Sequence, residues 1–261
     1  MPDPDATWVY AVVPAAPLVP LSTTAGVAGE PVRVLSHAGI SAVVGSISAA
    51  QAEPAALRRE LADPDWLAQA ARSHHRVVTT CTRSAPTVPF RLATIYHDDQ
   101  RVTGMLAARH RELVAALATV TRRAEWGVQA FATRPDQAAG DAPEPAGDPG
   151  RRGTAYLERR RAERAAADAW RRSAVAAAEQ LHCRLGGLAA ASVGPTATGR
   201  PAADHTGRQV LDAAYLVDDQ RRDEFTDAVR ELSQRYPALR LRLTGPWPAY
   251  SFVELAPEPA E

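Results

Sequence analysis

The sequence predicts an α+β protein built from two domains. Its 261 residues, 46% of them hydrophobic, are enough to bury more than one core. The order of predicted elements is β-β-β-α-β-α in the first half and β-α-β-β-α-β in the second, the latter being the ferredoxin-like order. We therefore expect an N-terminal mixed α+β sheet domain over residues 1–123 and a modified ferredoxin-like domain over residues 124–261.

Alternating and β-branched residues define the strands of the first half, and helix start signals define its helices. Pro54 suits the first turn of a helix beginning near Ala55, and Asp63 can cap a second start before Trp66. Asp98 or Asp99 can cap one further helix, which we expect to run to Arg122-Arg123. The predicted strands cover 7–13, 32–35, 40–47 and 88–96, with a turn at 36–39.

The second half begins with a strand over 124–133. Residues 134–151 are rich in Pro, Gly, Asp and Ala, which predicts a mobile loop. A long helix starts near Thr154, and its stretch 158–164 is charged and solvated. Next come a weak strand at 193–198, a flexible turn at 199–207 and a strong strand at 210–217. The helix that follows is capped by Asp218 or Asp219 and ended by Pro237.

The stretch 239–255, LRLRLTGPWPAYSFVEL, closes the second domain. Its leucines alternate with Arg240 and Arg242, which is typical of a half-buried strand. Thr244-Gly245-Pro246-Trp247-Pro248 should break that strand, because proline lacks a backbone donor, and a β-prone run resumes at Tyr250. Trp247 is either the cap of a stiff bend in an edge strand or a rigid partner-binding anchor. We expect Trp66, Trp126 and Trp170 to pack in cores.

Composition excludes several function classes. The net charge is zero, so nothing indicates a nucleic-acid partner. All 30 basic residues are arginine, and without lysine the chain can have neither a Schiff-base lysine nor a P-loop. No apolar run is long enough to span a bilayer, and the acidic start MPDPDATWVY does not resemble a signal peptide. We therefore expect a cytoplasmic protein with no membrane partner, reduced cysteines, and Cys81 as core filler.

No constellation of residues predicts catalysis. His74 and His75 are adjacent, so on a helix they point in different directions and cannot share a metal ion. The aspartate pairs precede helices, where capping explains them. We find no dinucleotide, hydrolase or zinc-protease motif, and we predict no catalytic residue, no cofactor and no metal site.

Four motifs occur in a fixed order along most of the chain. They are Val88-Pro89-Phe90-Arg91 with Thr94-Ile95-Tyr96, Glu125-Trp126-Gly127-Val128, the run GTAYLERRR at 153–161, and LTGPWPAYSFVEL at 243–255. With these motifs the chain resembles the gas vesicle protein F/L family. Three small or apolar residues, Phe90, Leu92 and Ala93, stand where the family more usually has Leu, Phe and Gly, and Ala249 stands where it often has a second Pro.

The resemblance implies a non-enzymatic accessory protein, associated with gas vesicles, that is required for their assembly and binds the small hydrophobic shell protein. A scaffold that binds other accessory vesicle proteins and a small-molecule-binding ferredoxin-like sensor remain as alternatives. Both domains of the α+β fold are also implied. The motifs mark as candidate partner-binding residues Phe90, Arg91, Glu125, Trp126, Gly127, Tyr156, Leu157, Arg160, Gly245, Pro246, Trp247, Pro248, Tyr250 and Phe252.

Overall fold

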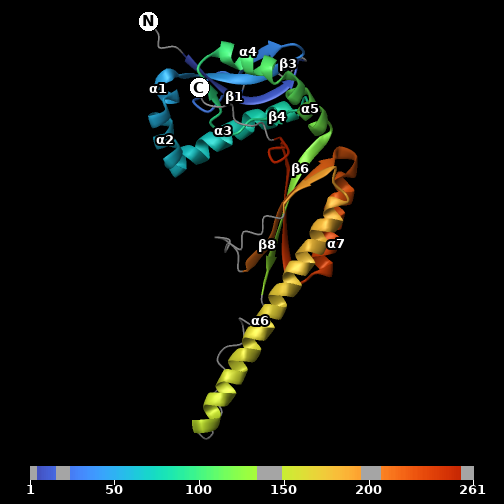
Figure 1. The fold of residues 1–261 in the computed structure, drawn as a ribbon. Coiled ribbons are helices and arrows are strands. Elements are labelled where there is room, and N and C mark those ends of the chain that lie inside the picture. Colours follow the sequence, from blue (N-terminus) through green and yellow to red (C-terminus); the bar gives the residue numbers. More distant parts are fainter. Residues whose placement is uncertain (1–4, 16–23, 134–148, 195–206, 254–261) are drawn as a thin grey trace. The chain divides into compact units, whose positions relative to one another are not determined.

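A computed structural model describes residues 5–15, 24–133, 149–194 and 207–253 (Figure 1). The chain forms two compact units. The first contains residues 1–125 and 246–261, and the second contains residues 126–245. The residues from Pro246 onwards, which the sequence analysis placed in the second domain, thus group with the first unit.

The first unit is built on a sheet whose strand order is β2-β3-β1-β4. The strands are β1 (Asp5–Pro14), β2 (Arg33–His37), β3 (Ile40–Ser48), β4 (Val88–Pro89) and β5 (Ile95–Tyr96), and β5 also pairs with β1. Antiparallel pairing aligns Ser36 with Ser41, so the hairpin between β2 and β3 turns over Ala38-Gly39. A bulge in β1 at Val9/Ala11 shifts the register, which lets Tyr10 and Ala11 both join the same core cluster.

Helices cover both faces of this sheet (Figure 1). They are α1 (Ala49–Ala52), α2 (Pro54–Ala62), α3 (Pro64–Thr82), α4 (Asp99–Ala108) and α5 (His110–Val120). Val77, Val78 and Cys81 of α3 pack against β1 and β3, whereas the side chain of Asp99 in α4 accepts a hydrogen bond from Thr7 on the other side of β1. The predicted caps are confirmed: Asp63 accepts from Asp65 N and Trp66 N, and Asp98 accepts from Arg101 N.

Two predictions for this unit were wrong. The single strand expected over 88–96 is two short strands, because the chain turns between them at Ala93, whose φ is 63°. The single helix expected after Asp99 is interrupted at Arg109, which has φ −104° and ψ 15°. The apolar spacing continues across that interruption, so the sequence pattern did not reveal it.

The second unit has the ferredoxin-like order of strands and helices. Its elements are β6 (Arg123–Ala132), α6 (Pro149–Gly186), β7 (Ala191–Val193), β8 (Arg208–Asp218), the 3₁₀ turn η3 (Asp219–Arg221), α7 (Arg222–Arg235) and β9 (Leu239–Trp247). The strands run β7-β8-β6-β9 across the sheet, which places β9 at an edge as predicted.

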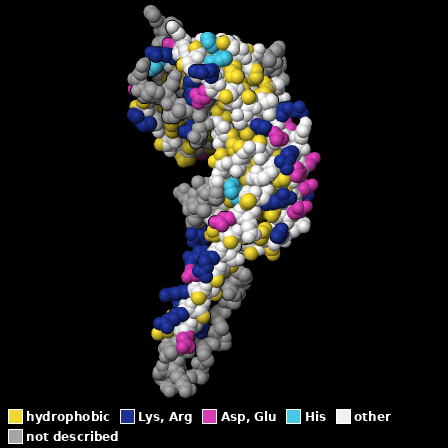
Figure 2. Space-filling model, turned by 45° about the vertical axis from the view of Figure 1, so that its right-hand side comes forward, with side chains coloured by type: hydrophobic (Ala, Val, Ile, Leu, Met, Phe, Trp, Pro, Cys, Tyr) yellow, Lys and Arg dark blue, Asp and Glu magenta, His cyan; other side chains and the backbone are white. Residues whose placement is uncertain are grey.

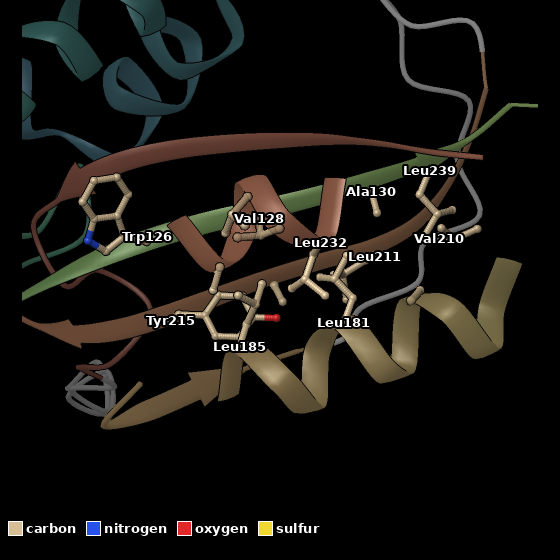
Figure 3. Packing of buried hydrophobic residues seen from close by; sticks show 14 of the residues in the cluster. Trp126, Val128, Ala130, Leu181, Leu185, Val210, Leu211, Tyr215, Leu232 and Leu239 are labelled. Atoms are coloured by element: carbon tan, nitrogen blue, oxygen red, sulfur yellow. The ribbon is translucent and has the colours of Figure 1, made fainter. Parts of the chain in front are cut away.

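One apolar cluster holds this unit together. Figure 3 shows side chains of β6 and β8, among them Val128 and Tyr215, pointing towards Leu181 and Leu185 of α6. Leu181 and Leu185 have no exposed surface, so each contributes about 1.5–3 kcal/mol of hydrophobic stabilisation. Trp126 belongs to the cluster and Trp170 packs against it, which confirms that both are core residues.

Several details differ from prediction. Helix α6 begins at Pro149, earlier than expected, and the rest of the predicted mobile loop, 134–148, lies outside the described residues, as do 195–206. Asp218 precedes η3 without a side-chain capping bond, and α7 follows Arg221. Strand β9 does not break at Thr244 but continues to Trp247, because an edge strand tolerates a proline on its unpaired side. Residues 248–253 form turns rather than the predicted strand.

Candidate functional site

The C-terminal motif forms a compact segment within the first unit. After β9, two turns follow in succession: Tyr250 N donates to Pro248 O at 2.8 Å, and Phe252 N donates to Ala249 O at 3.3 Å. Pro248 and Ala249 are buried, Ala249 being 3% exposed. Two buried residues and two local hydrogen bonds therefore fix the backbone on either side of Tyr250. We call Pro246–Val253 the C-terminal segment.

Glu125 anchors this segment. Glu125 is 8% exposed, and its carboxylate accepts two hydrogen bonds from Ser251, from the backbone N at 2.8 Å and from Oγ at 2.7 Å. Burial raises the pKa of Glu125 above its ordinary value, and the two Ser251 bonds act in the opposite direction by favouring the ionised form. A buried carboxylate needs such donors, so Glu125 has a positioning role that its sequence context alone did not reveal.

His75 of α3 supports the aromatic side chains of the segment. Its ring lies edge-on to Trp247, with centroids 5.3 Å apart at 64°, and 6.2 Å from the ring of Tyr250. His75 Nδ1 lies 3.5 Å from Tyr250 Oη, and Nε2 lies 3.2 Å from Thr79 Oγ1. Burial, followed by the charge of Glu125, raises the pKa of Tyr250. Sequence reasoning missed His75, because nothing in the local pattern couples it to residues so distant in the chain.

Part of this aromatic cluster remains open to solvent. Trp247 is 43% exposed and Tyr250 is 36% exposed. Their backbone is fixed by the buried Pro248-Ala249 pair and by Glu125, and their rings are held by His75. The arrangement is a pre-oriented aromatic surface, which loses little conformational entropy when a partner covers it.

Phe90 contributes to a different, fully internal network. Its side chain is 5% exposed, and its carbonyl oxygen lies 3.0 Å from His74 Nε2. The indole N–H of Trp8 donates to His74 Nδ1 at 3.2 Å, and because indole nitrogen only donates, Nδ1 must be unprotonated and Nε2–H must donate to Phe90. Burial lowers the pKa of His74 to about 4, so this imidazole is a neutral structural link.

Arg91 belongs to the turn that follows. Its side chain is exposed, and its carbonyl oxygen accepts from Thr94 N at 3.3 Å and Thr94 Oγ1 at 2.8 Å. The turn requires Ala93 to adopt a φ of 63°, a left-handed conformation that glycine adopts without strain. The conformation of Ala93 gives a physical reason for glycine at this position, where the resemblance leads us to expect it.

The remaining candidate residues lie in the second unit. Trp126 is 7% exposed and belongs to its core. Gly127 lies close to β9, where Thr244 Oγ1 donates to its carbonyl oxygen at 3.4 Å, and Gly245 has a φ of 120°. On α6, Tyr156 and Leu157 are 51% and 57% exposed, and Arg160 pairs with Glu163 at 3.3 Å.

The fourteen candidates are divided between the two units. In the first unit, Glu125, Pro246, Trp247, Pro248, Tyr250 and Phe252 come together in or around the C-terminal segment, while Phe90 and Arg91 shape the turn before β5. In the second unit, Trp126 lies in the core, Gly127 lies beside β9 and Gly245 within it, and Tyr156, Leu157 and Arg160 lie on the exposed part of α6.

The grooves in the described part of the second unit include two along α6. The larger, of about 420 Å³, lies between α6 and the start of β8, and its lining includes Trp170, Arg171, Arg172 and Arg208. The smaller, of about 340 Å³, lies between α6 and α7. Within residues 5–15, 24–133, 149–194 and 207–253, no group of three or more His, Cys, Asp or Glu side chains is arranged to hold a metal ion. No helix in these ranges combines the length and apolar character of a membrane span.

Comparison with known sequences supports a single family. The sequence model described as "Gas vesicle synthesis protein GvpL/GvpF" matches residues 6–254. Gas vesicle protein L of Streptomyces sp. (strain CB03234) is 38% identical over 235 residues, which cover 89% of this chain and 87% of that protein. Gas vesicle protein F2 of Halobacterium salinarum is 26% identical over 234 residues, covering 88% of this chain and 84% of that protein.

Solved structures share the fold. The crystal structure of the gas vesicle protein GvpF from Anabaena sp. PCC7120 superposes with a TM-score of 0.67 at 17% identity, covering 98% of this chain and 99% of that one. GvpF from Microcystis aeruginosa gives a TM-score of 0.64 at 18% identity, covering 96% and 99%. At these identities the likeness establishes the fold and not the residues of a site.

Proposed function

The chain belongs to the gas vesicle protein F/L family, and we propose that it is a non-enzymatic accessory protein of gas vesicle assembly that binds the small hydrophobic shell protein. In this proposal it acts in the cytoplasm and on the growing vesicle. The observation that carries the proposal is the pre-oriented aromatic surface of Trp247 and Tyr250, 43% and 36% exposed.

The chemistry of that surface suits an apolar protein partner. A shell subunit that has not yet polymerised exposes apolar surface and tends to aggregate. A binder needs a small apolar centre with polar groups around it. Trp247 and Tyr250 supply the centre, and the Tyr250 hydroxyl and the half-buried His75 ring supply polar atoms beside it. Tryptophan and tyrosine in such positions commonly contribute most of the binding energy.

Co-purification with the shell protein tests the proposal. We expect wild type to retain the shell protein and Trp247→Ala to lose it, with affinity falling about 30-fold, the effect of removing an anchor worth about 2 kcal/mol. The matched control is Val34→Ala, which trims another side chain of the first unit that is 45% exposed. Circular dichroism should show that both variants remain folded, because both side chains lie at the surface.

The outcomes separate the alternatives. Equal loss of binding in both variants would mean that general surface hydrophobicity, not the C-terminal segment, holds the shell protein. Retention by Trp247→Ala would make the segment a structural closure and refute the proposed contact. If wild type itself does not bind the shell protein, and vesicles form normally without this chain, the proposed function is wrong.

A scaffold for other accessory vesicle proteins is the second candidate, and the exposed part of α6 favours it. Tyr156 and Leu157 are adjacent there and more than half exposed, so together they offer apolar area to a partner. The small-molecule alternative needs an enclosed pocket with convergent polar groups. The larger groove of the described residues instead mixes arginines with Asp168 and Glu179.

A further inference from the structure

The first part of α6 extends beyond the core of the second unit. Residues 156–166, 168 and 169 are exposed. Ala174 is the first buried residue in the described part of this helix, and Ala178, Leu181 and Leu185 follow it. Figure 1 shows this part of α6 continuing past the strands of its own unit. At 1.5 Å per residue, the segment 156–169 is roughly 20 Å of helix, and none of its residues belongs to the described core cluster or packs against it. Isolated helices of this length are marginal in water.

One side of this helix carries a regular stripe. The stripe consists of Leu157, Arg161, Arg164, Asp168, Arg172 and Val175. These residues are spaced four, three, four, four and three apart, so on a helix that turns 100° per residue they fall within an arc of about 80°. The centre of this arc lies roughly 100° round the helix from the buried face. We call this stripe the arginine stripe. Its two apolar members are 57% and 47% exposed.

The three arginines of the stripe differ from other arginines of α6 in their ion pairing. Other arginines of α6 pair along the helix, Arg159 and Arg160 with Glu163 and Arg171 with Asp168. None of the described residues forms an ion pair with Arg161, Arg164 or Arg172. Figure 2 shows dark blue arginine side chains recurring along this part of α6. Counting three arginines against Asp168, the stripe carries a net charge of +2 in a chain whose net charge is zero.

The larger groove adjoins the stripe. Asp168, Arg172 and Val175 line it together with Val210 and Arg208 of β8, and no described residue pairs with Arg208 either. With Arg171 and Glu179, the charged lining of the groove is three arginines against two carboxylates, a net charge of +1, and Val175 and Val210 supply apolar contacts between them. This is the shape and charge that an amphipathic helix with acidic flanks fits, its apolar residues in the groove and its carboxylates on the arginines.

We propose that the arginine stripe and its groove bind an amphipathic, acidic helix of another protein. A second copy of this chain fits badly, because the stripe would bring a net charge of +2 against another +2. The proposal does not depend on shell-protein binding by the C-terminal segment. It supplies a separate surface, in the second unit, through which the chain could hold a further assembly component at the same time.

Charge reversal tests the proposal with a defined probe. The probe is a fluorescently labelled helical peptide of three heptads with leucine in its apolar seam and glutamate on both flanks, and its partner control carries lysine in place of glutamate. We expect wild type to bind the acidic peptide and the triple variant Arg161→Glu, Arg164→Glu, Arg172→Glu to bind it at least about tenfold more weakly. The reversed variant should instead gain affinity for the lysine peptide.

A control with the same net charge excludes a non-specific effect. Arg58, Arg59 and Arg240 are exposed and have no ion pair among the described residues, so converting these three to Glu changes the total charge equally but leaves the stripe intact. That variant should bind the acidic peptide nearly as wild type does. Because arginine and glutamate have similar helix propensity, helix content by circular dichroism should be unchanged in both.

The apolar ends distinguish a helix from a simple polyanion. The double variant Leu157→Ser, Val175→Ser leaves the charges in place and should bind the acidic peptide several-fold more weakly than wild type does. Extended polyglutamate should compete poorly with that peptide for binding to wild type. If the serine variant binds normally and polyglutamate competes as well as the peptide, the surface is a polyanion site and the proposal is wrong. It is equally refuted if wild type does not bind the peptide, or if both charge-reversal variants lose it alike.

Discussion

At the scale of single residues, the packing of the first unit depends on buried polar side chains whose hydrogen bonds fix their position. His74 is 3% exposed and bridges Trp8 and Phe90 in one tautomer. A second proton, on Nδ1, would point at the indole N–H and break the link to Trp8. Glu125 and Ser251 form a comparable link between the start of β6 and the C-terminal segment. Neither group needs a catalytic role to explain its position.

The pKa of His74 predicts how stability depends on pH. In the folded protein it is about 4, below the ordinary value of 6.5, so between these values the unfolded chain binds more protons. The free energy of unfolding should therefore be at its full value above pH 6.5 and fall by up to about 3 kcal/mol as the pH drops towards 4, at about 1.4 kcal/mol per unit.

Urea unfolding of wild type and two variants between pH 7 and pH 4 measures this effect. His74→Gln, which keeps an acceptor and a donor but cannot be charged, should flatten the pH dependence even though it is less stable at pH 7. His97→Gln, at an exposed position, should leave the wild-type slope unchanged. Equal slopes for wild type and His74→Gln would show that another group carries the pH dependence.

Ala93 offers a second test at this scale. Its φ of 63° costs an alanine about 1–2 kcal/mol, part of which glycine would lose again to the entropy of the unfolded chain. Ala93→Gly should therefore raise the free energy of unfolding by about 0.5–1 kcal/mol. Ala107→Gly, at an exposed position in α4, should lower it by about 1 kcal/mol. A loss of stability at both positions would mean that the turn at Ala93 is not strained.

At the scale of elements, local signals in the sequence predicted starts better than interruptions and ends. Asp63 and Asp98 were correctly assigned as caps because a cap bonds to backbone two or three residues away. The interruption at Arg109 and the turn at Ala93 were missed, because tertiary packing overrode a continuous apolar pattern. The extension of β9 to Trp247 was missed because its tolerance of Pro246 depends on its place at the edge of the sheet.

The contact of β9 with β6 can be tested by a double-mutant cycle. A methyl group at Gly127 would lie 2.6 Å from Thr244 Oγ1, whereas the Thr244 Cβ would be 4.0 Å away. Gly127→Ala alone should cost about 1–2 kcal/mol, because Thr244 must rotate and give up its bond to the Gly127 carbonyl. In a Thr244→Ala background the same change should cost clearly less.

The control for this cycle lies in α4. A methyl group at Gly104 would meet no atom within 4 Å, so Gly104→Ala should stabilise the protein by about 0.5–1 kcal/mol. Unfolding free energies from urea titrations at constant pH provide all the values. Strictly additive effects of Gly127→Ala and Thr244→Ala would contradict the close approach of the two strands.

At the scale of the whole molecule, the sequence predicted the fold class and the ferredoxin-like order of the second unit, both of which are confirmed. It could not predict which residues of the signature motifs contact one another within each unit. Ser251 and Glu125 are bonded although they lie in different motifs, and His75 joins Trp247 without belonging to any. Contacts between residues so distant in sequence leave no trace in spacing or periodicity. The sequence therefore predicted candidate residues but not which of them contact one another.

Complementation of cells that lack this chain tests the central claim, that the exposed aromatic surface of the C-terminal segment serves vesicle assembly. Wild type and Val34→Ala should restore buoyant vesicles, and Trp247→Phe should restore them in part, because it keeps an apolar ring beside His75. Trp247→Ala should accumulate to the wild-type level, as checked by immunoblot, yet yield few vesicles. Full restoration of vesicles by Trp247→Ala would contradict the account.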